Sequence, residues 1–331
     1  MNNFSYFRAD AVATALHEVT STSTAKFIAG GTNLIDLMKE NVERPGRLID
    51  INRLPLAKIE PLPDGGLRLG ALVTNTAVAY HPDIERRYPL LSKAILAGAS
   101  PQLRNMATVG GNLMQRTRCY YFYDTATPCN KREPGTSCSA LHGFNRIHAI
   151  LGSTDQCIAV HPSDMCVALA ALEAVVRVMG PEGERSIPFA EFHRLPGDTP
   201  HIDTTLKSDE IITAVDLPPA GFAAHHTYLK IRDRESYAFA LVSVAAAAEM
   251  NGDTIQELRL ALGGVAHKPW RDQRAESVLK NQKPTPDNCA KLATELLRDA
   301  KGHGHNDFKV ELARRAIIRA LSDATAGATG R

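Results

Sequence analysis

Four cysteines fall in one stretch of the chain that is rich in Gly, Pro, Asn, Arg and Tyr, namely Cys119, Cys129, Cys138 and Cys157. Nine, eight and eighteen residues separate them, so the Cys-x-x-Cys pairs of zinc ribbons and bacterial ferredoxins are absent. Four thiolates on one loop can nevertheless hold a metal centre. The spacing alone leaves three interpretations open: an iron–sulfur cluster, a structural zinc ion, or redox-labile thiols.

We call the segment that carries these cysteines, residues 116–157, the cysteine loop. It shows no helical or strand periodicity up to about residue 149, and so long an irregular segment needs a reason to be ordered. Its cationic side chains would lower thiol pKa values and offset the charge of a thiolate-bound cluster; they are Arg116, Arg118, Lys131, Arg132 and Arg146. Both features favour a metal centre and a redox function.

Two glycine pairs precede the cysteine loop, in the segments KFIAGGTN (Lys26–Asn33) and ATVGGNL (Ala107–Leu113). Paired glycines let the backbone approach a pyrophosphate without Cβ clashes, and N–H groups at a turn that enters a helix attract phosphate. Neither segment has the Rossmann or the Walker pattern, and either could be a plain turn. Two such turns in one domain favour a single phosphate-bearing ligand, with Arg104 and Arg116 adding charge or simply facing water.

Composition narrows the class of protein. The chain has 331 residues, which predicts more than one domain, and its formal net charge of +2 offers no basic field for nucleic acid. Its start lacks a signal-peptide pattern, and the longest apolar stretch is interrupted by charges, so we expect no membrane span. Six cysteines are too few for a disulfide scaffold in a chain of this length.

Hydrophobic periodicity predicts an α/β fold followed by an α+β fold, with a boundary at the helix- and strand-breaking segment PPAG, residues 218–221. Before it we expect helices at 11–19, 34–39, 75–98 and 165–172, and strands at 26–29, 47–51, 67–72, 175–178, 184–187 and 211–217. After it we expect strands at 227–232, 238–250 and 257–263, and helices at 272–279, 286–299 and 307–322.

The two glycine segments, the sequence HPSD at 161–164, and the C-terminal segments SYAFALVSVAAA and ALGGVAHKPWR resemble the FAD-binding medium subunits of molybdenum hydroxylases, the xanthine dehydrogenase and aldehyde oxidoreductase family. The resemblance covers nearly the whole chain, and the cysteine loop is similar to that of the bacterial periplasmic aldehyde oxidoreductase branch. It implies a two-part FAD-binding domain (PCMH-type) over residues 1–220, with parts at about 1–55 and 56–220. A C-terminal domain of the CO dehydrogenase flavoprotein type, a small antiparallel sheet with helices, would follow over 221–325, before a disordered tail at 326–331.

The resemblance also implies the cofactor site. The first turn would wrap the FAD diphosphate and ribityl chain with Lys26, Phe27, Ile28, Ala29, Gly30, Gly31, Thr32, Asn33 and Leu34. The opposite side would hold Ala107, Thr108, Gly110, Gly111, Asn112 and Arg116. Asp164 would meet the adenosine end, Ile211 and Ile212 would pack near the flavin ring, and Lys230 would stabilise the anionic reduced flavin. Without the resemblance, Lys230 reads as a snorkelling strand lysine.

By the same resemblance, Cys119, Cys129, Cys138 and Cys157 would bind a [4Fe–4S] cluster, whereas Cys166 and Cys289 are expected to be buried small hydrophobes. The aromatic run Tyr120–Tyr123 would shield the cluster, face a partner, or form a small core of the loop.

The implied function is electron transfer, as the FAD and iron–sulfur subunit of a heterotrimeric molybdenum-containing aldehyde oxidoreductase. A large molybdopterin-binding subunit would carry the substrate chemistry, a small 2Fe–2S subunit would deliver electrons, and FAD would pass them to an external acceptor. The chain would contain no catalytic residue for the substrate. The complex would be periplasmic through co-export, or cytoplasmic. Alternatives are a zinc-stabilised assembly protein, a xanthine dehydrogenase-type subunit that reduces NAD, and a stand-alone flavoenzyme.

Overall fold

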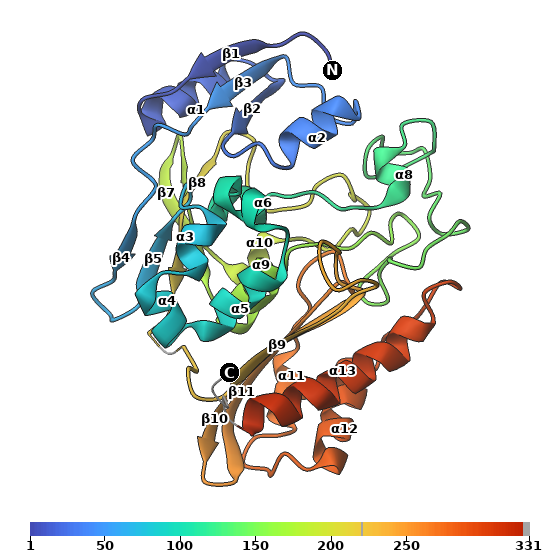
Figure 1. The fold of residues 1–331 in the computed structure, drawn as a ribbon. Coiled ribbons are helices and arrows are strands. Elements are labelled where there is room, and N and C mark those ends of the chain that lie inside the picture. The colour runs from blue at the N-terminus through green and yellow to red at the C-terminus, as the bar shows by residue number, and fades with distance from the viewer. Residues whose placement is uncertain (220, 327–331) are drawn as a thin grey trace.

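The computed structural model describes residues 1–219 and 221–326. Within these ranges, no helix is long and apolar enough to cross a membrane. The predicted disordered tail falls mostly outside the described residues, and its first residue, Ala326, is the C-cap of the last helix. The predicted order, an α/β unit followed by α+β structure, is confirmed (Figure 1).

The N-terminal unit is a small parallel sheet with two helices: β1 (Ser5–Arg8), α1 (Val12–Thr20), β2 (Ala25–Ile28), α2 (Leu34–Lys39) and β3 (Arg47–Asp50). The strand order is β1-β3-β2, so β3 lies in the middle and pairs in parallel with both neighbours. The amphipathic helix α1 buries its apolar face in the core beneath this sheet. β1 was not predicted, because its residues are mostly exposed and show no apolar alternation.

The second unit is built on a five-stranded antiparallel sheet in the order β4-β5-β8-β6-β7. Its strands are β4 (Ile59–Pro61), β5 (Leu67–Gly70), β6 (Val175–Gly180), β7 (Gly183–Pro188) and β8 (Ile211–Leu217). Its helices are α3 (Asn75–Ala79), α4 (Pro82–Arg87), α5 (Pro89–Ala97), α6 (Pro101–Met106), α7 (Val109–Leu113), α9 (Asp164–Ala171) and α10 (Phe189–Phe192). Three of these helices, α4, α5 and α6, have proline in the first turn, where the missing N–H costs nothing.

The cysteine loop leaves this unit after α7 and returns at α9. Within it the structure has a single short helix, α8 (Tyr120–Tyr123). Arg132 holds the loop together by donating from Nη1 to the carbonyl oxygens of Tyr121 at 2.8 Å and Phe122 at 2.9 Å. Isolated bridges pair Cys129 with Cys138 and Thr154 with Cys157. Side chains and local turns therefore supply the order that regular secondary structure does not.

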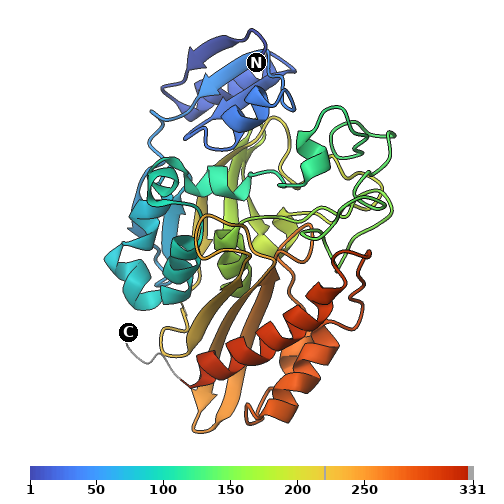
Figure 2. The ribbon, with the colours of Figure 1, turned by 45° about the vertical axis from the view of Figure 1, so that its right-hand side comes forward.

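The C-terminal unit is a three-stranded antiparallel sheet, β9 (His226–Ile231), β10 (Val242–Asn251) and β11 (Thr254–Gly263), with helices α11 (Gln273–Ser277), α12 (Pro286–Leu296) and α13 (Phe308–Thr325). Figure 2 shows α13 lying across one face of the sheet. Alternate residues of β10 belong to two different cores, with Val244 and Ala246 packing towards α12 and α13 and Ala245 and Ala247 packing towards α9. The strand is a continuous apolar run because both of its faces are buried.

Candidate cofactor site

A cavity of about 610 Å³ lies between the two glycine turns. Most of the predicted FAD-binding residues line it: Lys26, Phe27, Ile28, Ala29, Gly30, Gly31, Thr32, Asn33, Leu34, Ala107, Thr108, Gly110, Gly111, Arg116, Ile211 and Ile212. Three predicted residues, Asn112, Asp164 and Lys230, lie outside this wall. The fold thus brings together, around one cavity, segments that are about eighty and a further hundred residues apart in the sequence.

The first turn, between β2 and α2, presents free hydrogen-bond donors to the cavity. Among the described residues, the backbone N–H groups of Gly30 to Leu34 have no protein acceptor. Gly31 has φ of 72°, a left-handed conformation that glycine adopts without Cβ strain. Consecutive unpartnered N–H groups at the start of a helix form a concave anion site, so this turn fits the diphosphate of a dinucleotide.

Gly30 serves a different purpose, because it lets the two turns approach each other. A Cβ atom built on Gly30 would lie 1.8 Å from the carbonyl oxygen of Met106, at the end of α6. Backbone atoms cannot give way as a flexible side chain can, so any larger residue would separate the turns. The glycine is therefore required by packing before any ligand is considered.

In the second turn, the backbone N–H groups donate hydrogen bonds to acceptors within the protein. Val109 donates to the Val73 carbonyl at 2.9 Å, and Gly110 donates to that of Ala71 at 2.8 Å. The N–H of Gly111 donates to the side-chain oxygen of Thr108, the N-cap of α7, at 3.2 Å. A Cβ atom on Gly111 would meet only that capping oxygen, at 3.0 Å, so Gly111 presents a flat, open surface to the cavity.

Asn112 faces the protein interior, and its prediction as a ligand contact is not supported by this placement. Its amide nitrogen donates to the side-chain oxygen of Asn75 at 2.8 Å, and its own side-chain oxygen accepts from Gln115 and from Ser163. Ser163 in turn caps α9, accepting from the N–H of Cys166 at 3.1 Å. Asn112 therefore ties the second turn to the start of α9.

Charged side chains flank the first turn. Arg116 pairs with Glu43 at 2.8 Å and with Asp203, and Lys26 lies 3.5 Å from Glu43. Burial alone would raise the pKa of Asp203, but Lys131 and Arg116 hold it well below its usual range. Arg104 donates to the carbonyl of Gly98 and does not line the cavity, so only Arg116 of the two predicted arginines can add charge there.

Asp164 and Lys230 form a buried ion pair of 2.8 Å, and the hydroxyl of Tyr228 donates to Asp164 at 2.6 Å. The predicted contacts of Asp164 with the adenosine end and of Lys230 with the flavin ring stay predictions, and the ion pair places the two side chains together. The alternative of a snorkelling lysine is wrong, since the Lys230 side chain is only 5% exposed.

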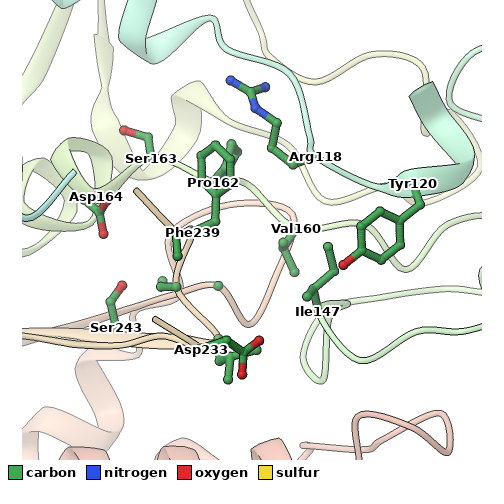
Figure 3. A pocket seen from close by; sticks show the side chains of 15 residues that line it. Arg118, Tyr120, Ile147, Val160, Pro162, Ser163, Asp164, Asp233, Phe239 and Ser243 are labelled. Carbon is green, nitrogen blue, oxygen red and sulfur yellow. The ribbon is translucent and has the colours of Figure 1, made fainter. Parts of the chain in front are cut away.

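Asp164 instead lines a second, smaller cavity of about 340 Å³. Figure 3 shows its mostly apolar wall, in which Phe239, Pro162 and Tyr120 are prominent, with Arg118 at one side. His161 lines the larger cavity and the next residue, Pro162, lines the smaller one, so both cavities border the same short segment of chain.

His161 and His193 also line the larger cavity, and sequence reasoning did not find them as site residues. Their ring centroids are 4.3 Å apart, and their ligand atoms lie within 4.8 Å of each other and of the Cys166 sulfur. His193 Nε2 lies 2.9 Å from the Leu113 carbonyl, and burial lowers the pKa of His193 to about 4, so its ring is neutral near pH 7. The HPSD segment was a signal for His161; nothing in the sequence pointed to His193.

The four loop cysteines converge in one cluster, together with Leu37, Phe122, Ala140, Ile158 and Ala159. Cys119, Cys129 and Cys157 are buried, Cys138 is half-buried, and none forms a disulfide within the described residues. A hydrogen bond with Cys157 lowers the pKa of Cys138 to about 6, whereas burial raises that of Cys119 to about 12. Cys166 and Cys289 are buried elsewhere, as expected of small hydrophobes.

The cationic residues of the loop do not surround the thiols as expected. Lys131 and Arg116 pair with Asp203, Arg132 binds backbone carbonyls, and Arg146 pairs with Asp233. Lys131 lowers the pKa of one cluster cysteine, Cys157, where the Cys138 hydrogen bond and burial outweigh it. The cations therefore order the loop more than they activate its thiols.

The four thiols do not form a ready-made site for a single tetrahedral ion among the described residues. Zn–S bonds of about 2.3 Å place the sulfurs of a tetrahedron about 3.8 Å apart. Within the described residues, no three of the four cysteine sulfurs form a group whose members all lie within 4.8 Å of one another. Cys138 and Cys157 lie within hydrogen-bonding distance of each other, so the four thiols gather closely without already forming a site for a single ion.

Comparison with known proteins matches both halves of this architecture. A family model described as the FAD binding domain in molybdopterin dehydrogenase matches residues 2–220, and one for the CO dehydrogenase flavoprotein C-terminal domain matches residues 227–324. The chain belongs to the family of FAD-binding subunits of molybdopterin dehydrogenases. The family resemblance stated from the sequence is thereby confirmed, and FAD is the dinucleotide for which the first turn is suited.

Among its relatives is the aldehyde oxidoreductase FAD-binding subunit PaoB of Escherichia coli, which is 51% identical over 99% of this chain and 100% of that protein. The carbon monoxide dehydrogenase medium chain of Hydrogenophaga pseudoflava is 26% identical over 92% of this chain and 90% of its own length. A solved carbon monoxide dehydrogenase structure from the same organism superimposes with a TM-score of 0.77, at 25% identity and 98% coverage of both chains.

Proposed function

We propose that this chain is the FAD- and [4Fe–4S]-binding subunit of a heteromeric, molybdenum-containing aldehyde oxidoreductase. That it is an oxidoreductase subunit that binds FAD follows from its family. The further assignment is carried by one observation: four cysteines, scattered over thirty-nine residues of irregular chain, gather in one buried cluster beside the FAD domain. Aldehyde as the substrate class is supported by the 51% identity to an aldehyde oxidoreductase subunit.

FAD would extend from the larger cavity, past the segment that holds His161 and Pro162, into the smaller one. Its diphosphate would bind the free N–H groups of the first turn and lie over the flat surface of Gly111. Its ring would occupy the smaller cavity, where Phe239 and Pro162 offer an apolar slot near the Asp164–Lys230 pair. Ile211 and Ile212, predicted at the ring, would then lie towards the adenosine end. FAD supplies the ability to take electrons singly and release them in pairs.

The iron–sulfur assignment is supported by the convergence of the four loop cysteines in one mostly buried cluster, since four cysteine thiolates are the usual ligands of a [4Fe–4S] centre. The cluster lies close to the smaller cavity along the chain, because Arg118 and Tyr120 line that cavity while Cys119, between them, joins the cysteine cluster. A ring in the smaller cavity would therefore be a near neighbour of the cluster.

The proposed partners are a large molybdopterin-binding subunit, a small 2Fe–2S subunit and an external electron acceptor. This is supported by relatives that are named as medium chains or subunits of complexes. We propose the periplasm as the compartment, reached by co-export with a partner; osmotic fractionation of the native host decides between periplasm and cytoplasm.

The test is cofactor analysis of the complex purified from the native host. We expect one FAD, about four irons and about four labile sulfides for each copy of this chain, in addition to the partners' cofactors. Cys129→Ser should abolish the four irons and keep FAD, whereas Cys289→Ser, in the C-terminal core, should change neither. Zinc in place of iron would overturn the cluster assignment, and NADH formation on substrate addition would favour the xanthine dehydrogenase type.

A further inference from the structure

We infer that His148 donates a hydrogen bond to the sulfur of Cys119 and thereby raises the reduction potential of the iron–sulfur cluster. This inference rests on the proposed function, because it assigns a role to a residue beside the proposed cluster. His148 belongs to no motif of the sequence and is not among the predicted ligands. In the structure, however, it lies directly against one of them.

The contact between the two residues is short and dry. His148 Nε2 lies 3.1 Å from Cys119 Sγ, and the two residues are 1% and 7% exposed. A thiolate that ligates iron carries only lone pairs, so the favourable arrangement is the one in which Nε2 bears the proton and donates it. With water largely excluded from both residues, this hydrogen bond is electrostatically stronger than one in solution, and it acts beside the backbone N–H groups of Phe122 and Tyr121 that also hydrogen-bond to Cys119.

The backbone of His148 is held from the C-terminal unit. Lys309, near the start of α13, donates from Nζ to the His148 carbonyl at 2.7 Å and to the Gly264 carbonyl at 2.6 Å. Asn306 adds bonds to the carbonyls of His148 at 3.2 Å and Ala149 at 3.0 Å. Lys309 is fully buried, and the partners of its ammonium group among the described residues are backbone carbonyls. Lys309 and Asn306 therefore act as positioning residues for the imidazole.

The consequence for the cluster follows from charge. Reduction adds negative charge, part of which resides on the ligating sulfurs, and a donor aimed at a sulfur stabilises the reduced form more than the oxidised form. Removal of the donor should therefore make reduction harder. Replacement by another donor of similar reach should preserve the potential.

The experiment is an EPR-monitored redox titration of the complete complex, comparing wild type with His148→Phe and His148→Gln. We expect His148→Phe to shift the equilibrium constant for one-electron reduction about tenfold against the reduced cluster, which is about 59 mV, and His148→Gln to shift it much less. His142→Phe is the matched control, because His142 is an exposed histidine of the same loop, and it should leave the potential unchanged. Iron content and FAD content are measured for every variant.

The outcomes separate this inference from the proposed function. If the wild-type complex shows no EPR signal from a cluster on this chain, the proposed iron–sulfur function is itself contradicted. A cluster with the same potential in wild type and His148→Phe would overturn the role of His148 alone. If His148→Phe loses its iron, wild-type protein labelled with ¹⁵N-histidine decides: pulsed EPR should detect nitrogen coupled to the reduced cluster, and its absence would overturn the inference.

Discussion

Both glycine turns contain a Gly-Gly pair, yet their backbone N–H groups have different roles in the fold. In the first turn, five consecutive N–H groups from Gly30 to Leu34 are left without a protein acceptor, so the backbone itself is the binding surface. In the second turn, the N–H groups of Val109, Gly110 and Gly111 are consumed by the fold, and the turn offers shape instead. One turn therefore binds the ligand and the other makes room for it.

The same division appears in the side chains that flank the turns. The first turn is bordered by ion pairs that link Lys26, Glu43, Arg116 and Asp203. The second turn is anchored by neutral hydrogen bonds, chiefly those of Asn112. The two similar motifs therefore have different physical roles. Substitutions in one turn should test its role without changing the other turn.

The largest effect is expected at Gly30. In Gly30→Ala the new methyl group collides with the Met106 carbonyl, which lies 1.8 Å from its position, and the two turns must separate. We expect loss of FAD from the purified protein and destabilisation of roughly 1–3 kcal/mol or more. Flavin absorbance and thermal unfolding measure both, and a variant that keeps FAD at full occupancy would contradict the packing role.

Gly111→Ala should separate binding from stability. Its methyl group points into the cavity and meets only the Thr108 side chain of the protein, so the melting temperature without FAD should not fall. A clash with bound FAD of roughly 1–3 kcal/mol should weaken the affinity about tenfold to a hundredfold. Titration of FAD into deflavinated protein checks this, and unchanged affinity would show that the ligand does not lie over Gly111.

Thr108→Val tests the self-contained hydrogen bonding of the second turn. It removes the cap that Gly111 donates to, at little change in volume, and should cost about 1 kcal/mol of unfolding free energy. Denaturant unfolding of the FAD-free protein gives the value. Thr76→Val, at an exposed hydrogen bond to Asn105, is the control and should cost less.

The smallest expected effect is a change of the unfolding free energy with pH, through the ion pairs beside the first turn. The pKa of Asp203 is lowered in the folded state by Lys131 and Arg116, so its contribution to stability is complete above the unfolded value near 3.8 and is lost as pH falls towards the folded value. Because this carboxylate is partly exposed, we expect less than about 1 kcal/mol. In Asp203→Asn, this loss of unfolding free energy at acid pH should be absent. If the variant and the wild type lose stability equally as pH falls, the assignment is contradicted.

Much of the fold could be predicted from periodicity. The apolar run of β10, the glycine turn before α2 and the Ser163 cap of α9 each carry a local signal that the structure follows. β1 carries none, because its four residues are held by pairing with β3 and not by their own pattern. Local patterns predict elements well where burial is periodic, and poorly where pairing with a distant strand decides.

Most residues that line the larger cavity could be predicted from the sequence, but the hydrogen bonds and ion pairs of the site could not. The ion pair of Asp164 with Lys230 joins residues sixty-six positions apart, and no local pattern signals it. The cations of the cysteine loop were visible as charges, but their partners, such as Asp203 for Lys131, come from segments that only tertiary packing brings near. The difference between Gly30 and Gly111 likewise depends on which atoms stand opposite each glycine.

The sheet of the C-terminal unit has a consequence for how the chain can be divided. β10 places Ala245 and Ala247 against α9 and α5, helices that belong to the preceding unit, while α12 and α13 cover only the other face. Cutting the chain between β8 and β9 would expose this alanine face to solvent on one fragment. It would expose the apolar surface of α5 and α9 on the other. The two units should therefore melt as one cooperative block, in a single calorimetric transition, and neither should be obtained as a well-folded fragment by expression alone.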